Sequence, residues 1–107
     1  MLEDKTTERA MAIRKAYHQL EETYHAASWS IEEDALAFLT DAALVGRLVM
    51  SQENRWPSKS EEQLPHKIAE SFWWLIVLAK RMDIDPHQAL DTFLKEKEAL
   101  LLDKKSD

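Results

Sequence analysis

The sequence predicts an all-α protein, and two observations support that prediction. The chain has one glycine and three prolines among its 107 residues, which leaves little material for the turns of hairpins and sandwiches. Apolar residues also recur at steps of three and four along four segments, as they do in helices that pack on a core. We therefore expect one four-helix, bundle-like domain over residues 1–107, with helices at about 7–25, 30–52, 64–82 and 86–102.

The first helix is predicted from its amphipathic pattern. One face carries the apolar residues Ala10, Ile13, Tyr17, Leu20 and Tyr24. The other face carries the charged residues Arg9, Arg14, Lys15, Glu21 and Glu22. A helix of this kind is expected to lie on the core with its charged face in water.

The second helix is predicted to begin after Ser30. Ser30 and Glu33 form the capping-box pattern, in which each side chain bonds the backbone N–H of the other residue. Apolar residues then occupy most sides of the helix, with polar interruptions at Asp34, Thr40, Asp41 and Arg47. A helix with so wide an apolar surface touches several neighbours or forms an interface between subunits.

Prolines mark the starts of the last two helices. Residues 52–63 break the helical period and read as a loop, and Pro65 then suits the first turn of the third helix. Asp85 and Pro86 form a capping residue followed by proline at the first helical position, which predicts the start of the fourth helix.

Composition excludes several classes of protein. The absence of cysteine excludes disulfides, zinc–thiolate sites and a cysteine nucleophile. The first nine residues are too charged for a secretory signal, and the longest apolar run, residues 72–79, is too short to span a bilayer. A net charge of −6 repels nucleic-acid phosphates. We expect a cytoplasmic protein without a membrane or nucleic-acid partner.

Two acids stand in apolar surroundings. Residues 68–79 carry only two polar side chains, and one of them is Glu70. Asp41 has a similar setting, because its neighbours one turn away are apolar. Burying an unpaired carboxylate is costly, so each acid needs a partner. The second and third helices are expected to pack antiparallel, which would bring Asp41 and Glu70 together.

Two interpretations of these acids remain open. Converging carboxylates provide the hard oxygen ligands that Mg²⁺ or Mn²⁺ prefers. Alternatively, a basic side chain pairs with them, and Lys67, Arg47 and Lys80 are the available partners. Lys67 lies three residues before Glu70, a spacing at which opposite charges meet on a helix.

The same residues resemble the MazG-like family of all-α nucleoside triphosphate pyrophosphohydrolases. The matching stretches are AESFWWL at 69–75, LAKRMDID at 78–85 and Ala89-Leu90, and the resemblance covers about residues 29–95. It implies Mg²⁺ as cofactor, held by E-E-x-x-E on one helix and E-x-x-D on the next. It also implies cleavage of a nucleoside triphosphate to the monophosphate and pyrophosphate. Finally, it implies a homo-oligomer, a dimer or tetramer that buries its central helices.

Only part of the acidic motif of the family is present. Asp41 matches one of the three glutamates of the first motif, and Thr40 and Leu44 stand at the other two. Glu70 stands at the aspartate of the second motif, and Lys67 replaces its glutamate. The resemblance therefore implies Asp41 and Glu70 as the metal ligands. Two acids are too few to neutralise a metal pair that holds a triphosphate.

Four tryptophans complete the candidate residues. Trp29, Trp56, Trp73 and Trp74 are expected in the core and at a subunit interface. Trp56, in the loop, is alternatively a residue that stacks on a nucleotide base, and Lys67 one that contacts its phosphates. Two functions follow: a nucleotide pyrophosphohydrolase, or a non-catalytic relative that acts in nucleotide sensing or protein–protein association.

Overall fold

The computed structural model describes residues 4–53 and 61–102. These residues contain four α-helices and no strand, so the prediction of an all-α chain is confirmed. The helices are α1 (Asp4–His25), α2 (Ile31–Gln52), α3 (Leu64–Arg81) and α4 (Pro86–Leu101), and a short 3₁₀ turn, η1 (Glu61–Gln63), precedes α3. Across the described ranges, no helix has both the length and the apolar character needed to cross a membrane.

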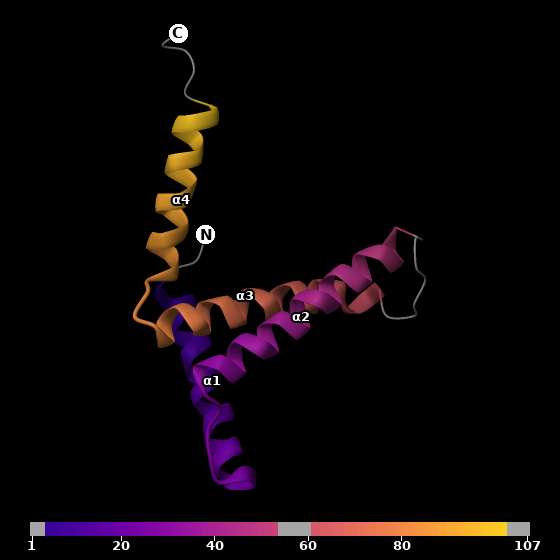
Figure 1. The fold of residues 1–107 in the computed structure, drawn as a ribbon, viewed down its shortest axis with the longest axis vertical. Helices are drawn as coiled ribbons and strands as arrows, with labels where there is room; N and C mark the ends of the chain where they lie inside the picture. The colour runs from indigo at the N-terminus through magenta and orange to yellow at the C-terminus, as the bar shows by residue number, and fades with distance from the viewer. Residues whose placement is uncertain (1–3, 54–60, 103–107) are drawn as a thin grey trace.

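The centre of the fold is the antiparallel hairpin of α2 and α3 (Figure 1). Its buried apolar residues are Leu48 on α2 and Trp74, Ile76 and Val77 on α3. The predicted capping box is present: the Glu33 N–H donates to Ser30 Oγ at 3.1 Å, and the Ser30 N–H donates to Glu33 Oε1 at 2.7 Å. The cap satisfies two backbone donors, and therefore fixes where the hairpin begins.

Helix α1 lies across the end of the hairpin where α2 begins and α3 ends (Figure 1). Trp73 Nε1 donates to the Ala10 carbonyl at 3.0 Å, which joins α3 to α1. Arg14 is buried on this face, so the prediction that it lies on the solvent side of the first helix is wrong. Its charge is tolerated there because acidic partners surround it. Half of the Tyr17 surface, on the expected apolar face, is instead exposed.

Helix α4 leaves the end of α3 and projects away from the hairpin (Figure 1). Asp85 Oδ1 accepts the N–H groups of His87 and Gln88 at 3.0 and 3.1 Å, the cap that the sequence predicts. None of the residues of α4 is buried.

The result is an open, angular molecule. Its radius of gyration is 17.4 Å, whereas a compact domain of this length has a radius of about 13 Å. The bundle-like arrangement therefore exists within α1, α2 and α3, and α4 stands apart from it.

Candidate functional site

Asp41, Lys67 and Glu70 form an ionic group at the middle of the hairpin, here called the lysine bridge. Lys67 Nζ lies 3.0 Å from Glu70 Oε1 and 3.3 Å from Asp41 Oδ1. The ion pair expected between Lys67 and Glu70 is therefore present, and Asp41 shares the same ammonium. Trp74 Nε1 donates to the other oxygen of Asp41 at 2.8 Å.

The lysine bridge is only partly buried. The side chains of Asp41, Lys67 and Glu70 are 12, 22 and 30 % exposed. The hydrogen bond to Glu70 is the largest influence on Lys67, and with Asp41 it raises the pKa of the ammonium although burial opposes it. Lys67 is therefore fully charged at neutral pH, and one cation faces two carboxyl groups.

The bridge does not fit the magnesium site that the resemblance implies. Lys67 Nζ sits between the two carboxylates and already neutralises one of them. No group of three or more potential ligands among histidine, aspartate and glutamate gathers in the described part of the chain. A cation that holds a triphosphate needs several acidic or neutral oxygen ligands, and an ammonium among them opposes its charge.

The two predicted substrate contacts stay predictions. Trp56 lies outside the described residues. Lys67 contacts carboxylates in the structure, and a role on phosphates would require it to leave them. His66 lies at the rim of the same site, with Nε2 at 3.9 Å from Glu70 Oε1.

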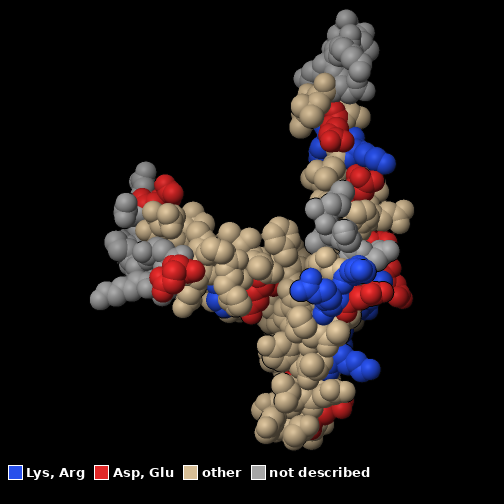
Figure 2. Space-filling view, turned by 180° about the vertical axis from the view of Figure 1, so that it is seen from behind, with Lys and Arg blue, Asp and Glu red and all other residues tan. Residues whose placement is uncertain are grey.

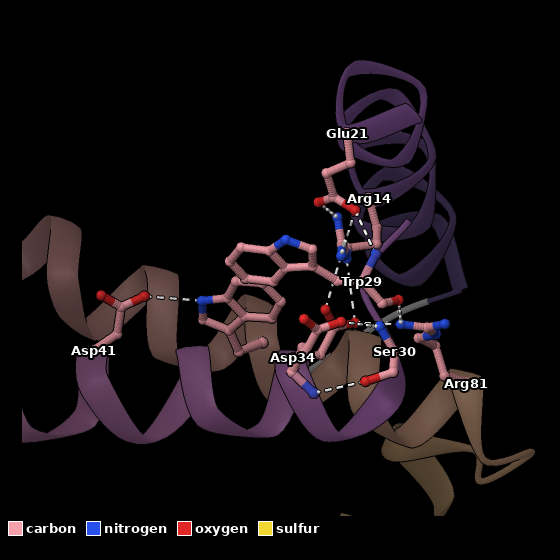
Figure 3. Close-up of polar contacts among 9 residues, drawn as sticks. Arg14, Glu21, Trp29, Ser30, Asp34, Asp41 and Arg81 are labelled. Carbon is pink, nitrogen blue, oxygen red and sulfur yellow. Dashed lines mark hydrogen bonds and ion pairs between the residues drawn. The ribbon is translucent and has the colours of Figure 1, made fainter. Parts of the chain in front are cut away.

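A second and more deeply buried ionic group joins three helices. It consists of Arg14 and Glu21 of α1, Asp34 of α2 and Arg81 of α3, and we call it the arginine cluster (Figure 3). Arg14 donates to Asp34 through Nη2 at 2.7 Å and through Nε at 3.2 Å, a bidentate pair. Arg81 Nη1 donates to Asp34 at 2.7 Å, and Arg14 Nη1 donates to Glu21 at 2.9 Å.

The central pair of the arginine cluster is closed to water, and the cluster is electrically balanced. The Asp34 side chain is fully buried and that of Arg14 is 1 % exposed. Burial works against the Arg14 charge, but hydrogen bonds to Asp34 and Glu21 raise its pKa overall. Two arginines face two carboxylates, so each buried charge has a partner.

The cluster also fixes the connection between α1 and α2. Glu21 Oε1 accepts the Trp29 backbone N–H at 2.8 Å, and Arg81 Nη1 donates to the Trp29 carbonyl at 3.1 Å (Figure 3). Burial opposes the Glu21 charge, yet the bonds from Arg14 and Trp29 lower its pKa. The position of this cluster at the junction indicates a structural role.

His18 borders the arginine cluster. Its Nε2 is buried without a hydrogen-bond partner among the described residues. Burial lowers the pKa of His18, and the charges of Arg14 and Arg81 lower it further against the opposing effect of Glu21 and Asp34. The imidazole is therefore held in its neutral form.

The sequence reasoning missed the arginine cluster. Asp34 precedes Asp41 by seven residues, so the two acids share a face of α2. The argument that singled out Asp41 applied equally to Asp34. No local pattern marks Arg14 or Arg81, because they stand 20 and 47 residues from Asp34.

Fold and site together define an all-α protein with a helical hairpin, a buried arginine cluster and a lysine-bridged acid pair. Comparisons with family models, with curated proteins and with solved structures found no match to this chain. The resemblance to the MazG-like family therefore stands on its motif residues alone.

Proposed function

We propose that this is a non-catalytic MazG-like protein that acts by association, with its hairpin paired against that of a second copy. One observation supports the loss of catalysis: Lys67 Nζ lies within 3.3 Å of both remaining acids. In the motif that the chain resembles, an acid occupies the position of Lys67. The substitution reverses the charge at the place where the family binds its metal.

An apolar face of the hairpin supports the association. It lines a groove of about 280 Å³ with Phe38, Ala42 and Val45 of α2 and Ile68, Phe72 and Leu75 of α3. We call these six residues the hairpin face. Phe72 is 56 % exposed, an unusual state for the central residue of a core helix. A contiguous apolar patch of this kind marks an interaction surface.

A second copy is the occupant that fits this face. In a two-fold interface the same patch meets itself, so a self-complementary apolar surface needs no other partner. The lysine bridge lies on a different side of α3, since Glu70 lines a groove with Tyr17 and Trp73. Pairing through the hairpin face would therefore bury apolar residues and leave the charged group accessible.

A turnover assay tests the proposal. Pyrophosphate release is measured on a panel of nucleoside triphosphates with Mg²⁺ or Mn²⁺, for the wild type and for Asp41→Ala. We expect no release above the blank and no metal-dependent rise in melting temperature, because Lys67 opposes the cation. Turnover that disappears in Asp41→Ala would overturn the proposal. Sedimentation of the wild type is expected to give a dimer.

The pyrophosphohydrolase is the second candidate. It is favoured by the position of Asp41 and Glu70, which come from different helices and contact one cation. The variant Lys67→Glu separates the two functions, because it supplies a third carboxylate to the same site. We expect this variant to gain a Mn²⁺-dependent rise in melting temperature that the wild type lacks. If the wild type shows the same rise, its own two acids bind the metal and the non-catalytic proposal fails.

A further inference from the structure

Helix α4 has an apolar stripe that the described chain leaves exposed. The stripe consists of Leu90, Phe93, Leu94, Leu100 and Leu101, and all five are exposed. A single helix of 16 residues is only marginally stable in water. Its stability in proteins comes from packing of such a stripe. The stripe therefore requires a partner surface.

The stripe is continuous with the hairpin face. Leu90 lines a groove of about 530 Å³ together with Ile13 of α1 and Phe72 and Ile76 of α3. Phe72 lines the hairpin face as well. Stripe, groove and hairpin face thus form one angular apolar surface. Figure 2 shows uncharged residues over much of the hairpin arm and an open angle between this arm and α4.

The surface area matches what a stable homodimer buries. The chain exposes 8257 Å², whereas a compact monomer of its mass, 12.5 kDa, exposes roughly 6,200 Å². The surplus is of the order of 2,000 Å² per copy, counted over the whole chain and including the residues outside the described ranges. Obligate dimers bury roughly 1,000–2,500 Å² per partner, a range that includes this surplus.

We propose that α4 of each copy packs across the loop end of the hairpin of a second copy. The inference rests on the hairpin pairing proposed above. A two-fold axis across the middle of antiparallel hairpins brings the loop end of one beside the base of the other, from which α4 projects (Figure 1). The exchange is reciprocal, so both stripes are covered at once.

Val49 identifies the surface that receives α4. It continues the row of Phe38, Ala42 and Val45 along α2 at helical spacing, and it is the member nearest to the loop. Its side chain is 42 % exposed. The stripe of α4, centred on Leu94, therefore packs on Val49 of the second copy.

The charges of α4 allow this contact. Asp91 and Lys95 pair with each other at 3.1 Å. Lys97 lies within the stripe, one turn from Phe93 and Leu101, and its Nζ is 5.7 Å from the centre of the Phe93 ring. Asp91 and Lys95 lie away from the stripe, and a lysine stem is long enough to carry the Lys97 ammonium to the edge of the contact, so these three charges need not be buried when the stripe packs.

Cross-linking between engineered cysteines tests the contact, because the chain has no cysteine of its own. Leu94→Cys and Val49→Cys are prepared separately, refolded together from urea and treated with a short bismaleimide. We expect a covalent dimer in the mixture and in neither variant alone. The control Thr92→Cys has no stripe residue three or four positions away, so it lies on the side of α4 away from the stripe and is expected to give none with Val49→Cys.

A second reporter separates the two proposals. Ala42 lies at the middle of α2, so Ala42→Cys is expected to cross-link to itself across the two-fold axis. If Ala42→Cys reacts and the Leu94–Val49 pair does not, the α4 contact is wrong and the hairpin pairing stands. If none of them reacts and sedimentation gives a monomer, both proposals are overturned.

A charge variant provides a measurement that needs no cross-linker. Leu94→Lys is expected to raise the dissociation constant of the dimer at least about tenfold, because an apolar anchor is removed and a charge is placed against Val49. Thr92→Lys, an exposed position on the side of α4 away from the stripe, is expected to leave it unchanged. Equal dimerisation by both variants would contradict the α4 contact, and circular dichroism confirms that each is folded.

Discussion

The arginine cluster and the lysine bridge both pair charged side chains between helices, but they differ in charge balance and in exposure. Both place charges among apolar helices, but the cluster is balanced, with two arginines against two acids, and its central pair, Arg14 and Asp34, is closed to water. The bridge has one cation for two acids and is partly open. The comparison teaches that the balanced group, with its buried central pair, fixes the junction of three helices, whereas the unbalanced group leaves a second acid within reach of solvent.

This difference predicts unequal energies. Removing one partner from a buried ion pair leaves the other charge without compensation, which costs about 3–5 kcal/mol. Pairs that solvent reaches contribute less, because water and salt screen them. The variants below are ordered by the size of the effect that this comparison predicts.

The largest effect is expected for Asp34→Ala. The substitution removes the acid that pairs with both Arg14 and Arg81, and it should lower the free energy of unfolding by about 3–5 kcal/mol. Urea denaturation measures the change. Glu32→Ala, an exposed acid in the same helical turn, is the control and is expected to change stability by less than about 0.5 kcal/mol. Equal costs for the two variants would show that the buried cluster does not determine the fold.

Lys67→Met is expected to have the next largest effect, about 2 kcal/mol. It leaves Asp41 and Glu70 facing each other without their common cation, but solvent reaches the site and limits the cost. Lys80→Met, an exposed lysine of the same helix, is the matched control. The raised pKa of Lys67 sets the pH window. Its stabilisation is complete below the unfolded value of 10.5 and is lost as pH rises through the folded value. A cost that persists in the alkaline range would contradict the ionic explanation.

Local pattern predicted the helix starts and one of the two ionic groups. The Ser30–Glu33 and Asp85 caps, and the three-residue spacing of Lys67 and Glu70, are short-range features and can be read directly. The pairing of Arg14 with Asp34 depends on how α1 crosses α2. That angle follows from packing and has no local signature.

The predicted amphipathic face of α1 failed for a related reason. Its apolar residues were expected on the core, yet Ile13, Tyr17 and Leu20 are half exposed in a single copy. Periodicity identifies an apolar face but does not tell which body covers it. The same ambiguity applies to α4. Its apolar period can be read from the sequence, but the period does not show that α4 leaves the bundle.

Trp74→Phe is expected to cost about 1 kcal/mol, a smaller effect within the lysine bridge. It removes the indole N–H that donates to Asp41 Oδ2 at 2.8 Å and leaves a partly buried carboxylate oxygen without a donor. Trp73→Phe is the matched control, because its indole donates at 3.0 Å to a neutral backbone carbonyl. Hydrogen bonds to charged acceptors are the stronger ones, so Trp74→Phe should cost more. The reverse order in thermal denaturation would mean that Asp41 depends on Lys67 alone.

The smallest expected effect is the decrease in folding stability in acid that His18, beside the arginine cluster, produces. Its lowered pKa means that the unfolded chain binds more protons than the folded chain as the pH falls through the unfolded value of 6.5. Stability should therefore decrease as the solution is acidified from about pH 8 to about pH 5. In His18→Gln the decrease should be shallower, because the neutral amide cannot take up the proton. Lys67 titrates only in the alkaline range. If the dependence of stability on pH below pH 8 changes in Lys67→Met and not in His18→Gln, the acid response does not come from His18 and the prediction is wrong.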